Sequence, residues 1–466
     1  MTAFADLVQP DRGQPARQLQ AVDKTGHEEW LKALPPRAKA AAAAQRFAGK
    51  AGEMVILPGD NPDDWSVAVG VDSSKALGPW CLAKAAEALP EGTYRLDGCS
   101  GGPAILGWLL AQHRFDRYRK PDGQPGDRIL LTGDAARIDD TVRLAEAVAL
   151  VRDLVNTPTE DLGPAQLQQA VEQVAGGGAT VRVTTGDDLA QGYPMIQAVG
   201  RAAPRERAPR LIELEWGNPA HPRVAIVGKG VCFDTGGLDI KPASGMRLMK
   251  KDMGGAAHAL ALARLIIGAR LPVRLHLLIP AVENAIAGNA VRPGDVLRSR
   301  KGLTVEVSNT DAEGRLILAD ALARAMEDKP ELILDFATLT GAARVALGPD
   351  LPATFSNDEA LVADLLEAGT AESDPLWRLP LWDGYDEMLR SDIADLDNAP
   401  EGGMAGAVTA ALFLQRFVDR DTPWAHLDTF AWRPSGKPGR PKGGDALGLR
   451  AAWAMLRKRY PPVSPS

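Results

Sequence analysis

Four acidic side chains stand in two glycine-containing segments of the chain, which we expect to be strand-to-helix loops. They are Asp234 and Asp252 in residues 228–255, and Asp311 and Glu313 in residues 309–316. Asp311 and Glu313 are two positions apart, so they diverge on a helix but lie on one side of an extended or looped backbone. Carboxylates gathered in this way repel one another unless a cation neutralises them. A hard divalent metal ion takes oxygen ligands of this kind, which makes the four side chains candidate metal ligands.

Histidine is missing from both acidic segments. The chain has six histidines, and the nearest, His258, follows the first segment. This pattern excludes a histidine-rich zinc site of the H-E-x-x-H kind. Four carboxylates exceed what one tetrahedral zinc accepts, but they suit two metal ions that share bridging ligands. The residues alone therefore indicate a two-metal hydrolase, and they do not identify its substrate.

A purely structural explanation of the same residues competes with the metal site. An Asp-x-Glu sequence in a glycine-containing loop is commonly a solvated turn, and Asp234 before two glycines suits a turn or a helix cap. Lys229 and Lys241 would then be surface charges. Both explanations stay open, but the metal site gains support because each acidic segment follows an expected strand, at 223–227 and 303–307, and we expect both strands in one sheet.

Strands and helices are expected to alternate from about residue 160 onward. The expected strands are 211–216, 223–227, 273–279, 303–307 and 332–336, and the expected helices are 255–267, 315–326 and 407–418. Several strands are continuous apolar runs, which suits a sheet covered on both faces. The alternation predicts an α/β catalytic domain with a central mixed, largely parallel sheet covered by helices. Ligands of such sheets bind beyond the carboxyl ends of the strands.

The first part of the chain predicts a smaller α/β domain. Short apolar runs at 54–57 and 66–71 and a strand at 129–132 are separated by turn residues, and a helix is expected at 140–154. We therefore expect an N-terminal α/β domain over residues 1–135, a connecting helix over 136–160, and the catalytic domain over 161–466.

The overall composition is that of an ordinary globular protein. Of the 466 residues, 45% are apolar, and 60 acidic against 53 basic side chains leave a formal charge of −7. This balance argues against a nucleic-acid partner and against an anionic membrane surface. Three cysteines cannot form a disulfide framework, the N-terminus shows no apolar signal segment, and arginines interrupt the longest apolar stretch, residues 259–280. We expect a cytoplasmic protein without a membrane span.

Three segments of the chain resemble the signature sequences of the leucine aminopeptidase (cytosol aminopeptidase) family. They are residues 227–242, 249–256 and 309–316, and the last, Asn-Thr-Asp-Ala-Glu-Gly-Arg-Leu, is close to diagnostic. Supporting likeness extends over residues 150–466, whereas the first 135 residues match the family's variable N-terminal domain in position only. The departures are small: Cys232, Thr235 and Asp239 stand where the family more often has other residues.

The resemblance implies a metal-dependent aminopeptidase with two divalent metal ions. Lys229, Asp234, Asp252 and Glu313 would hold one ion, and Asp234, Asp311 and Glu313 the other, with Asp234 and Glu313 bridging. Lys229 would bind as a neutral amine. The ions would be zinc or manganese, with magnesium as a third option, and a water bridging them would attack the N-terminal peptide bond.

The resemblance also implies roles for residues around the metals. Lys241 would polarise the scissile carbonyl, and Arg315 would hold a bicarbonate that acts as the general base. Four residues would line the substrate cleft, with the first in the apolar pocket for the first side chain: Met249, Asn309, Thr338 and Leu339. The family implies short peptides with leucine-like first residues as substrates, and a homohexamer.

Two alternatives stay open at this point. The first is a two-metal hydrolase of another substrate class, such as phosphate esters, but no arginine-rich clamp accompanies the acidic segments apart from Arg315. The second is a DNA-binding role alongside peptidase activity, which the formal charge of −7 opposes.

Overall fold

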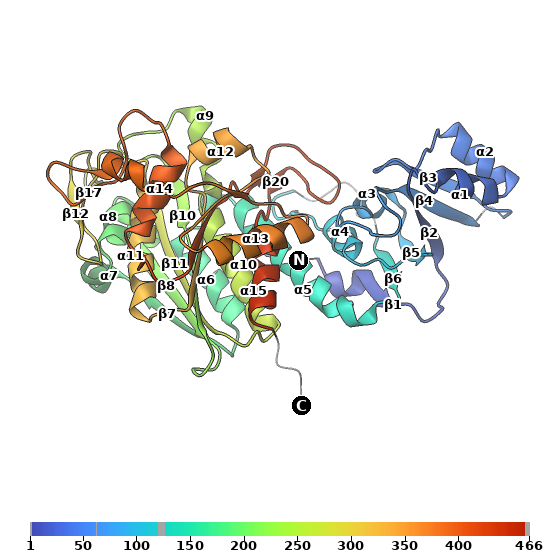
Figure 1. Ribbon diagram of the computed structural model, residues 1–466, viewed down its shortest axis with the longest axis horizontal. Coiled ribbons are helices and arrows are strands. Elements are labelled where there is room, and N and C mark those ends of the chain that lie inside the picture. The colour runs from blue at the N-terminus through green and yellow to red at the C-terminus, as the bar shows by residue number, and fades with distance from the viewer. Residues whose placement is uncertain (1, 62, 120–125, 462–466) are drawn as a thin grey trace. The chain divides into compact units, whose positions relative to one another are not determined.

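The structure, a computed structural model, describes residues 2–61, 63–119 and 126–461 (Figure 1). The chain divides into two units. The first comprises Met1–Ala149 and Ser435–Lys442, and the second comprises Leu150–Pro434 and Gly443–Ser466. The domain limits expected at residues 135 and 160 stay a prediction.

A six-stranded sheet forms the centre of the first unit. Its strands, in spatial order, are β1 (Val8–Pro10), β6 (Arg128–Thr132), β5 (Gly92–Asp97), β2 (Arg17–Val22), β4 (Trp65–Gly70) and β3 (Met54–Pro58). Neighbouring strands are parallel except β3 and β4. Its helices include α1 (His27–Ala33), α2 (Pro36–Ala44), α3 (Ala83–Ala88) and α4 (Ala104–Leu110). The strand predicted at 129–132 is confirmed as β6, the apolar runs at 54–57 and 66–71 lie largely in β3 and β4, and the unit is α/β as expected.

Helix α5 (Ile138–Asn156) runs across the sequence boundary between the two units. It confirms the helix predicted at 140–154 and extends two residues further at each end. The helix ends before Thr157, which precedes Pro158, and a residue before proline is disfavoured in helical geometry.

The second unit is built on a nine-stranded mixed sheet. Its strands, in spatial order, are β16 (Trp377–Arg378), β15 (Ala353–Ser356), β18 (Trp424–Asp428), β14 (Leu332–Ala337), β9 (Arg223–Gly228), β11 (Arg274–Asn284), β8 (Arg210–Trp216) and β7 (Thr180–Thr184), with β10 (Gly230–Asp234) pairing with β11. The central strands β18, β14, β9 and β11 run parallel, while β15 and β8 are antiparallel to their inner neighbours. The predicted strands at 211–216, 223–227, 273–279 and 332–336 are confirmed.

Helices cover both faces of this sheet, as the continuous apolar strands predict (Figure 1). One face carries α10 (Gly254–Gly268), with α6 (Pro164–Ala175), α15 (Leu449–Arg459) and α13 (Glu359–Ala371) in the same layer. The other carries α8 (Pro194–Gly200), α11 (Glu313–Glu327) and α14 (Gly406–Gln415), which share one apolar core with the sheet. The predicted helices at 255–267, 315–326 and 407–418 are confirmed, with the last ending at Gln415.

Two expectations about the acidic segments are wrong. Residues 230–234 are not a loop but strand β10, because β11 continues to Asn284 and offers them a parallel partner. The strand near 303–307 is β13 (Thr304–Glu306), and it lies in a separate sheet with β12 (Val296–Arg298) and β17 (Leu396–Asp397). Only the middle residue of β13 is fully buried, so this strand does not have the two buried faces of a central strand.

The longest apolar stretch, residues 259–280, divides between α10 and β11. Within the described ranges, none of the helices has the length and apolar character needed to cross a bilayer.

Candidate metal centre

The carboxyl ends of two strands and the starts of two helices meet at one edge of the central sheet. Lys229 directly follows β9, and Asp234 is the last residue of β10. Asp252 lies between the 3-10 helix Met249–Lys251 and α10, and Glu313 is the first residue of α11. Because β9 and β10 both run parallel to β11, their carboxyl ends point to the same edge. The core of the unit therefore delivers all four side chains to one place.

Lys229, Asp252 and Glu313 form a buried group that we call the Lys229 corner. The Nζ atom of Lys229 lies 2.7 Å from Oδ2 of Asp252 and 3.0 Å from Oε1 of Glu313, and each of these side chains is 3% exposed. The ammonium also donates to the backbone carbonyl of Thr338 at 3.2 Å. Gly314 leaves room for the lysine, because a Cβ there would stand 2.6 Å from its Cε atom. The corner is thus packed as tightly as the core around it.

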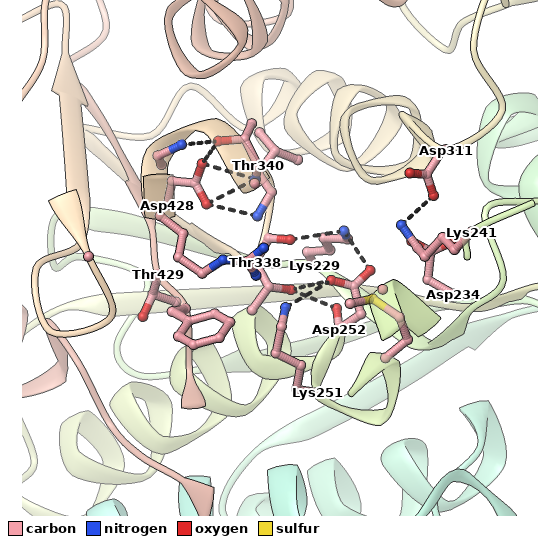
Figure 2. Close-up of a pocket in the computed structure, with 18 of the residues that line it drawn as sticks. Lys229, Asp234, Lys241, Lys251, Asp252, Asp311, Thr338, Thr340, Asp428 and Thr429 are labelled. Carbon is pink, nitrogen blue, oxygen red and sulfur yellow. Dashed lines mark hydrogen bonds and ion pairs between the residues drawn. The ribbon is translucent and has the colours of Figure 1, made fainter. Parts of the chain in front are cut away.

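Lys241, Asp234 and Asp311 form a more open group, the Lys241 corner. The Nζ atom of Lys241 lies 2.9 Å from Oδ2 of Asp234 and makes a short contact with Oδ1 of Asp311, which faces it in Figure 2. Oδ1 of Asp234 accepts hydrogen bonds from the backbone N–H of Gly236 at 2.8 Å and from Nδ2 of Asn284 at 2.9 Å. Asp311 is 32% exposed, so this corner borders solvent.

The carboxylates of the two corners converge and are incompletely satisfied. Asp234, Asp252 and Glu313 each offer an oxygen that lies within 4.8 Å of the others. Oδ2 of Asp252, Oδ1 of Asp311 and Oε1 of Glu313 are buried without a hydrogen-bond partner, although a lysine ammonium is close to each. Buried carboxylate oxygens are unfavourable in this state and are suited to coordinate a cation. The residues present therefore fit divalent metal ions with oxygen-rich ligand sets.

Burial and mutual repulsion raise the pKa of two of the carboxylates. Burial, followed by the negative charge of Asp234, raises the pKa of Glu313 to about 8 and that of Asp311 to about 6. Burial alone would lower the pKa of Lys229 and Lys241, but the neighbouring carboxylates outweigh it and raise the pKa of both above the ordinary lysine value. The arrangement therefore favours the binding of additional positive charge.

The segment that follows β14 supports the Lys229 corner. The hydroxyl of Thr338 donates to Oδ1 of Asp252 at 2.7 Å. Asp428, the last residue of the adjacent strand β18, holds the rest of the segment. Its carboxylate accepts from the N–H of Leu339 at 2.8 Å, and from the N–H and hydroxyl of Thr340 at 3.1 Å and 2.7 Å (Figure 2). Asp428 thus holds the two residues that follow Thr338, which is the residue of this segment that contacts the corner.

A second set of contacts joins the two acidic segments. Oδ2 of Asp239 accepts from the backbone N–H of Thr310 at 2.7 Å, and the N–H of Asp239 donates to the hydroxyl of Thr310 at 2.9 Å. The same hydroxyl donates to the carbonyl of Gly236 at 2.6 Å. Asp239, which departs from the usual family residue, therefore has a structural role at this site.

A cavity of about 310 Å³ borders both corners. Three of the four residues expected in the substrate cleft, Met249, Thr338 and Leu339, line it together with the carboxylates Asp234 and Asp252. The fourth, Asn309, lines a second cavity of about 220 Å³. The structure thus brings most of the expected cleft residues to the metal centre and separates Asn309 from Met249 between two cavities.

Arg315 lines the second cavity. Its Nη1 atom donates to the carbonyl of Asn398 at 2.6 Å, while its buried Nε atom has no hydrogen-bond partner. Burial lowers the pKa of Arg315 to about 10, which still leaves the guanidinium charged at neutral pH. A charged guanidinium with a spare N–H beside a cavity can bind a small anion.

Three residues that the sequence analysis does not single out contribute to the site: Asn284, Asp428 and Lys251. Asn284 lies beyond the predicted end of its strand, and the apolar residues Ala281 and Val282 are the signal that extends the strand to it. Asp428 acts on residues 88 and 89 positions away, which no local pattern shows. Lys251 lies next to Asp252 and lines the larger cavity.

Comparison with protein families matches both parts of the chain. The model described as "Cytosol aminopeptidase family, catalytic domain" matches residues 149–452, and the one described as "M17 aminopeptidase, N-terminal domain" matches residues 18–130. A protein of Syntrophotalea carbinolica named "Probable cytosol aminopeptidase" is 44% identical over 372 residues, which are 76% of this chain and 74% of the relative.

Solved structures agree with this result. The crystal structure of cytosol aminopeptidase from Coxiella burnetii has a TM-score of 0.92 and 45% identity, and the match covers 98% of this chain and 100% of that one. The bottromycin maturation enzyme BotP in complex with Mn has a TM-score of 0.86 and 32% identity over 98% of this chain and 100% of that one. Since sequence and structure match these proteins over nearly the whole chain, it belongs to the cytosol aminopeptidase family and is a metallo-aminopeptidase.

Proposed function

We propose that this chain releases the N-terminal residue of short peptides with two divalent metal ions. The observation that carries the proposal is the convergence of the unsatisfied carboxylates beside a cavity. Lys229, Asp234, Asp252 and Glu313 would hold one ion, and Asp234, Asp311 and Glu313 would hold the other. We propose zinc or manganese as the ions, with magnesium as a third option. When bound, such a pair lowers the pKa of a shared water so that hydroxide is available near neutral pH.

Two cationic side chains complete the proposed site. Lys241 stays charged at neutral pH, since neighbouring carboxylates raise its pKa, and it borders the cavity, so it donates to the carbonyl oxygen of the scissile bond and to the oxyanion that develops there. Arg315 holds a small anion, which we propose is bicarbonate, through its spare N–H. When bound, such an anion would supply a general base at this position.

The lining of the larger cavity supports a leucine-like first residue. Met249, Leu339, Leu351 and Phe430 present apolar surface there, and Thr338 adds a hydroxyl. The carboxylate-lined end of the same cavity favours a free α-amine, which restricts cleavage to the first peptide bond. Asn309 in the second cavity is proposed to contact the remainder of the peptide.

We further propose that the chain acts in the cytoplasm as a homohexamer. The relatives named cytosol aminopeptidases support the location. Large apolar side chains that are exposed on the second unit, among them Trp377, Trp382 and Met404, are the kind of surface that an assembly covers. Light scattering of the purified full chain tests the proposal, which requires six chain masses per particle.

The activity is tested with the full chain supplied with Mn²⁺ or Zn²⁺. Leucyl amides should be hydrolysed, whereas N-acetyl-leucyl amides should not, because acetylation removes the free amine. Asp252→Ala and Glu313→Ala should abolish the reaction, with Glu387→Ala, an exposed glutamate elsewhere in the second unit, as a matched control. Full activity in purified Asp252→Ala and Glu313→Ala protein, or cleavage of phosphate esters in place of leucyl amides, would overturn the proposal.

A further inference from the structure

Two cations in the wall of the larger cavity have no place in the proposed mechanism. They are Lys251, at the end of the 3-10 helix Met249–Lys251, and Arg344, in helix α12 (Gly341–Leu347). Both lie over the same aromatic ring: Nζ of Lys251 is 5.4 Å and Cζ of Arg344 is 4.8 Å from the ring centroid of Phe430. Residues separated by more than ninety positions therefore form one cationic wall, defined here as Lys251, Arg344 and Phe430.

The other charged groups that line the cavity are already engaged. Lys229 and Lys241 contact the carboxylates of the two corners. Asp428 accepts hydrogen bonds from Leu339 and Thr340. Lys251 and Arg344, the two cations of the cationic wall, are therefore the charged groups available to a ligand.

The cationic wall has little negative charge of its own. The carboxylate oxygen that comes within ion-pair range of Lys251 is Oδ1 of Asp252, at 3.7 Å, and that oxygen already accepts the hydroxyl of Thr338 at 2.7 Å. Throughout the residues that the structure describes, Arg344 makes no ion pair, and its side chain is exposed. A guanidinium cannot lose its charge at physiological pH, so this wall attracts anions.

The wall lines the same cavity as Met249, the residue proposed to contact the first side chain. Lys251 and Met249 come from the same 3-10 helix, and the side chains of both border this cavity. Figure 2 shows Lys251 and Asp252 approaching the cavity from neighbouring positions, with Thr338 between them and Asp428. A side chain that extends past Met249 therefore enters a cavity whose lining includes both cations.

We propose that the cavity accepts peptides whose first residue is glutamate or aspartate, as a substrate class in addition to leucine-like residues. The inference rests on the proposed function of the same site. The side-chain carboxylate accepts N–H donors of Arg344, in the bidentate manner that a planar guanidinium allows, and the ammonium of Lys251 adds a second contact. The methylene groups of the substrate pack against Phe430 and Met249, as the corresponding part of leucine would.

The test compares substrates that differ only in charge. For the Mn²⁺-loaded full chain we expect kcat/KM for glutamyl amides to exceed that for glutaminyl amides by about tenfold, the size expected when a charge-assisted hydrogen bond is gained. Arg344→Gln should reduce this ratio about tenfold, whereas Arg344→Lys, which keeps the charge but loses the planar fork, should retain part of it. Arg420→Gln, which removes an exposed arginine of the second unit away from the cavity, should leave the ratio unchanged.

A binding measurement separates this inference from the proposed reaction. Calorimetric titration of the Mn²⁺-loaded chain with free glutamate and free glutamine should show tighter binding of glutamate, and Arg344→Gln should remove the difference. Equal binding of the two, or a difference that Arg344→Gln leaves intact, would overturn the inference even in an active enzyme. So would a preference for acidic residues at the second position only. If no aminoacyl amide is hydrolysed, the proposed function fails, and the titration still decides the inference.

Discussion

Two clusters of metal-type ligands lie at opposite ends of the central strands. At the metal centre, Asp234, Asp252 and Glu313 follow the carboxyl ends of β9 and β10 or begin a helix there. At the other end, Glu215 and Asp328 stand beside His276, near the start of β11, and their ligand atoms also lie within 4.8 Å of one another. We call this second group the His276 cluster. By residue type and distance alone, both qualify as metal sites.

The counter-ions distinguish the two clusters. In the His276 cluster, arginines approach the carboxylates: Nη2 of Arg223 lies 2.7 Å from Oδ2 of Asp328 and 3.2 Å from Oε1 of Glu215. The neighbouring Glu213 is contacted by Nε of Arg324 at 3.0 Å and by Nε2 of His276 at 3.1 Å. At the metal centre the partners are lysines, and three carboxylate oxygens have an ammonium beside them but no hydrogen-bond donor aligned with them.

Arginine and lysine have different consequences for a carboxylate. Arginine offers five N–H donors in a planar fork and satisfies several oxygens at once, whereas lysine is a point charge with three donors. A cluster whose carboxylates accept hydrogen bonds from arginines is a structural ion-pair network. A cluster whose carboxylate oxygens lack such donors can bind a metal ion. Proximity of ligand-type residues is therefore insufficient evidence for a metal site, and hydrogen-bond satisfaction is the better criterion.

The largest effect is expected on metal affinity. Glu313→Gln should weaken Mn²⁺ binding to the full chain by more than about a hundredfold, because it removes a shared ligand. Glu215→Gln makes the same chemical change in the His276 cluster and should leave Mn²⁺ binding unchanged. Calorimetric titration and metal analysis after dialysis measure both. Equal losses in the two variants would remove the distinction between the clusters.

For the stability of the metal-free protein, we expect the larger effect from a substitution beside the His276 cluster and the smaller one from the metal centre. Glu213→Gln should lower the free energy of unfolding by roughly 3 kcal/mol, because it leaves buried cationic partners without their carboxylate. Glu313→Gln should change it by less than about 1 kcal/mol, since it removes a carboxylate that burial and Asp234 disfavour. Urea unfolding of chelator-treated protein measures both values, and a larger loss in Glu313→Gln would contradict the comparison.

Glu313 at the metal centre and Glu213 beside the His276 cluster should also respond to pH with opposite sign. Burial raises the pKa of Glu313 from 4.5 to about 8, so the folded state keeps a proton that the unfolded state has lost, and metal-free stability falls as pH rises from about 5 to 8. Burial would also raise the pKa of Glu213, but His276, Arg324 and Arg182 outweigh it and lower the pKa from 4.5 to about 2. The stability from Glu213 is therefore present above pH 4.5 and is lost as pH falls towards 2.

Thermal melting of the metal-free chain across pH checks these signs. Glu313→Gln should flatten the decline on the alkaline side, and Glu213→Gln the decline on the acidic side. A Glu313→Gln protein that still loses stability between pH 5 and 8 to the same extent as the parent would show that another group is responsible.

The smallest effect concerns the support of the metal centre. Asp428→Asn keeps the size of the side chain but removes its charge, so the segment with Leu339 and Thr340 is held less firmly. We expect kcat/KM on leucyl amides to fall about tenfold with metal content unchanged, because Asp428 positions residues and binds no ion. Asp419→Asn, an exposed aspartate of the same unit, is the control. Loss of bound metal in Asp428→Asn would instead make Asp428 part of the ligand set.

Much of the site can be predicted because its chemistry is local in sequence. Asp311 and Glu313 stand two residues apart, and their position before a helix with an apolar face follows from short-range patterns that the structure confirms in α11. The same is true of Lys229 after the apolar strand β9. Such features depend on the preferences of neighbouring residues, which a single sequence contains.

Other features depend on contacts that no local pattern specifies. The assignment of β13 to its own sheet follows from pairing with β17, some ninety residues later, and β10 is a strand because β11 lies beside it. Asn284 donates a hydrogen bond to Asp234, which lies 50 residues earlier in the sequence. The cationic wall joins Lys251 and Arg344 through a ring from a third segment.

The amino-acid sequence by itself determined the ligand types, the elements that carry most of them and the class of reaction. Only the tertiary structure decided which carboxylates are left unsatisfied, which cations remain unpaired and which residues hold them in place. The physical reason is that side-chain chemistry belongs to the residue, whereas burial, charge balance and hydrogen-bond satisfaction arise only when distant segments pack together.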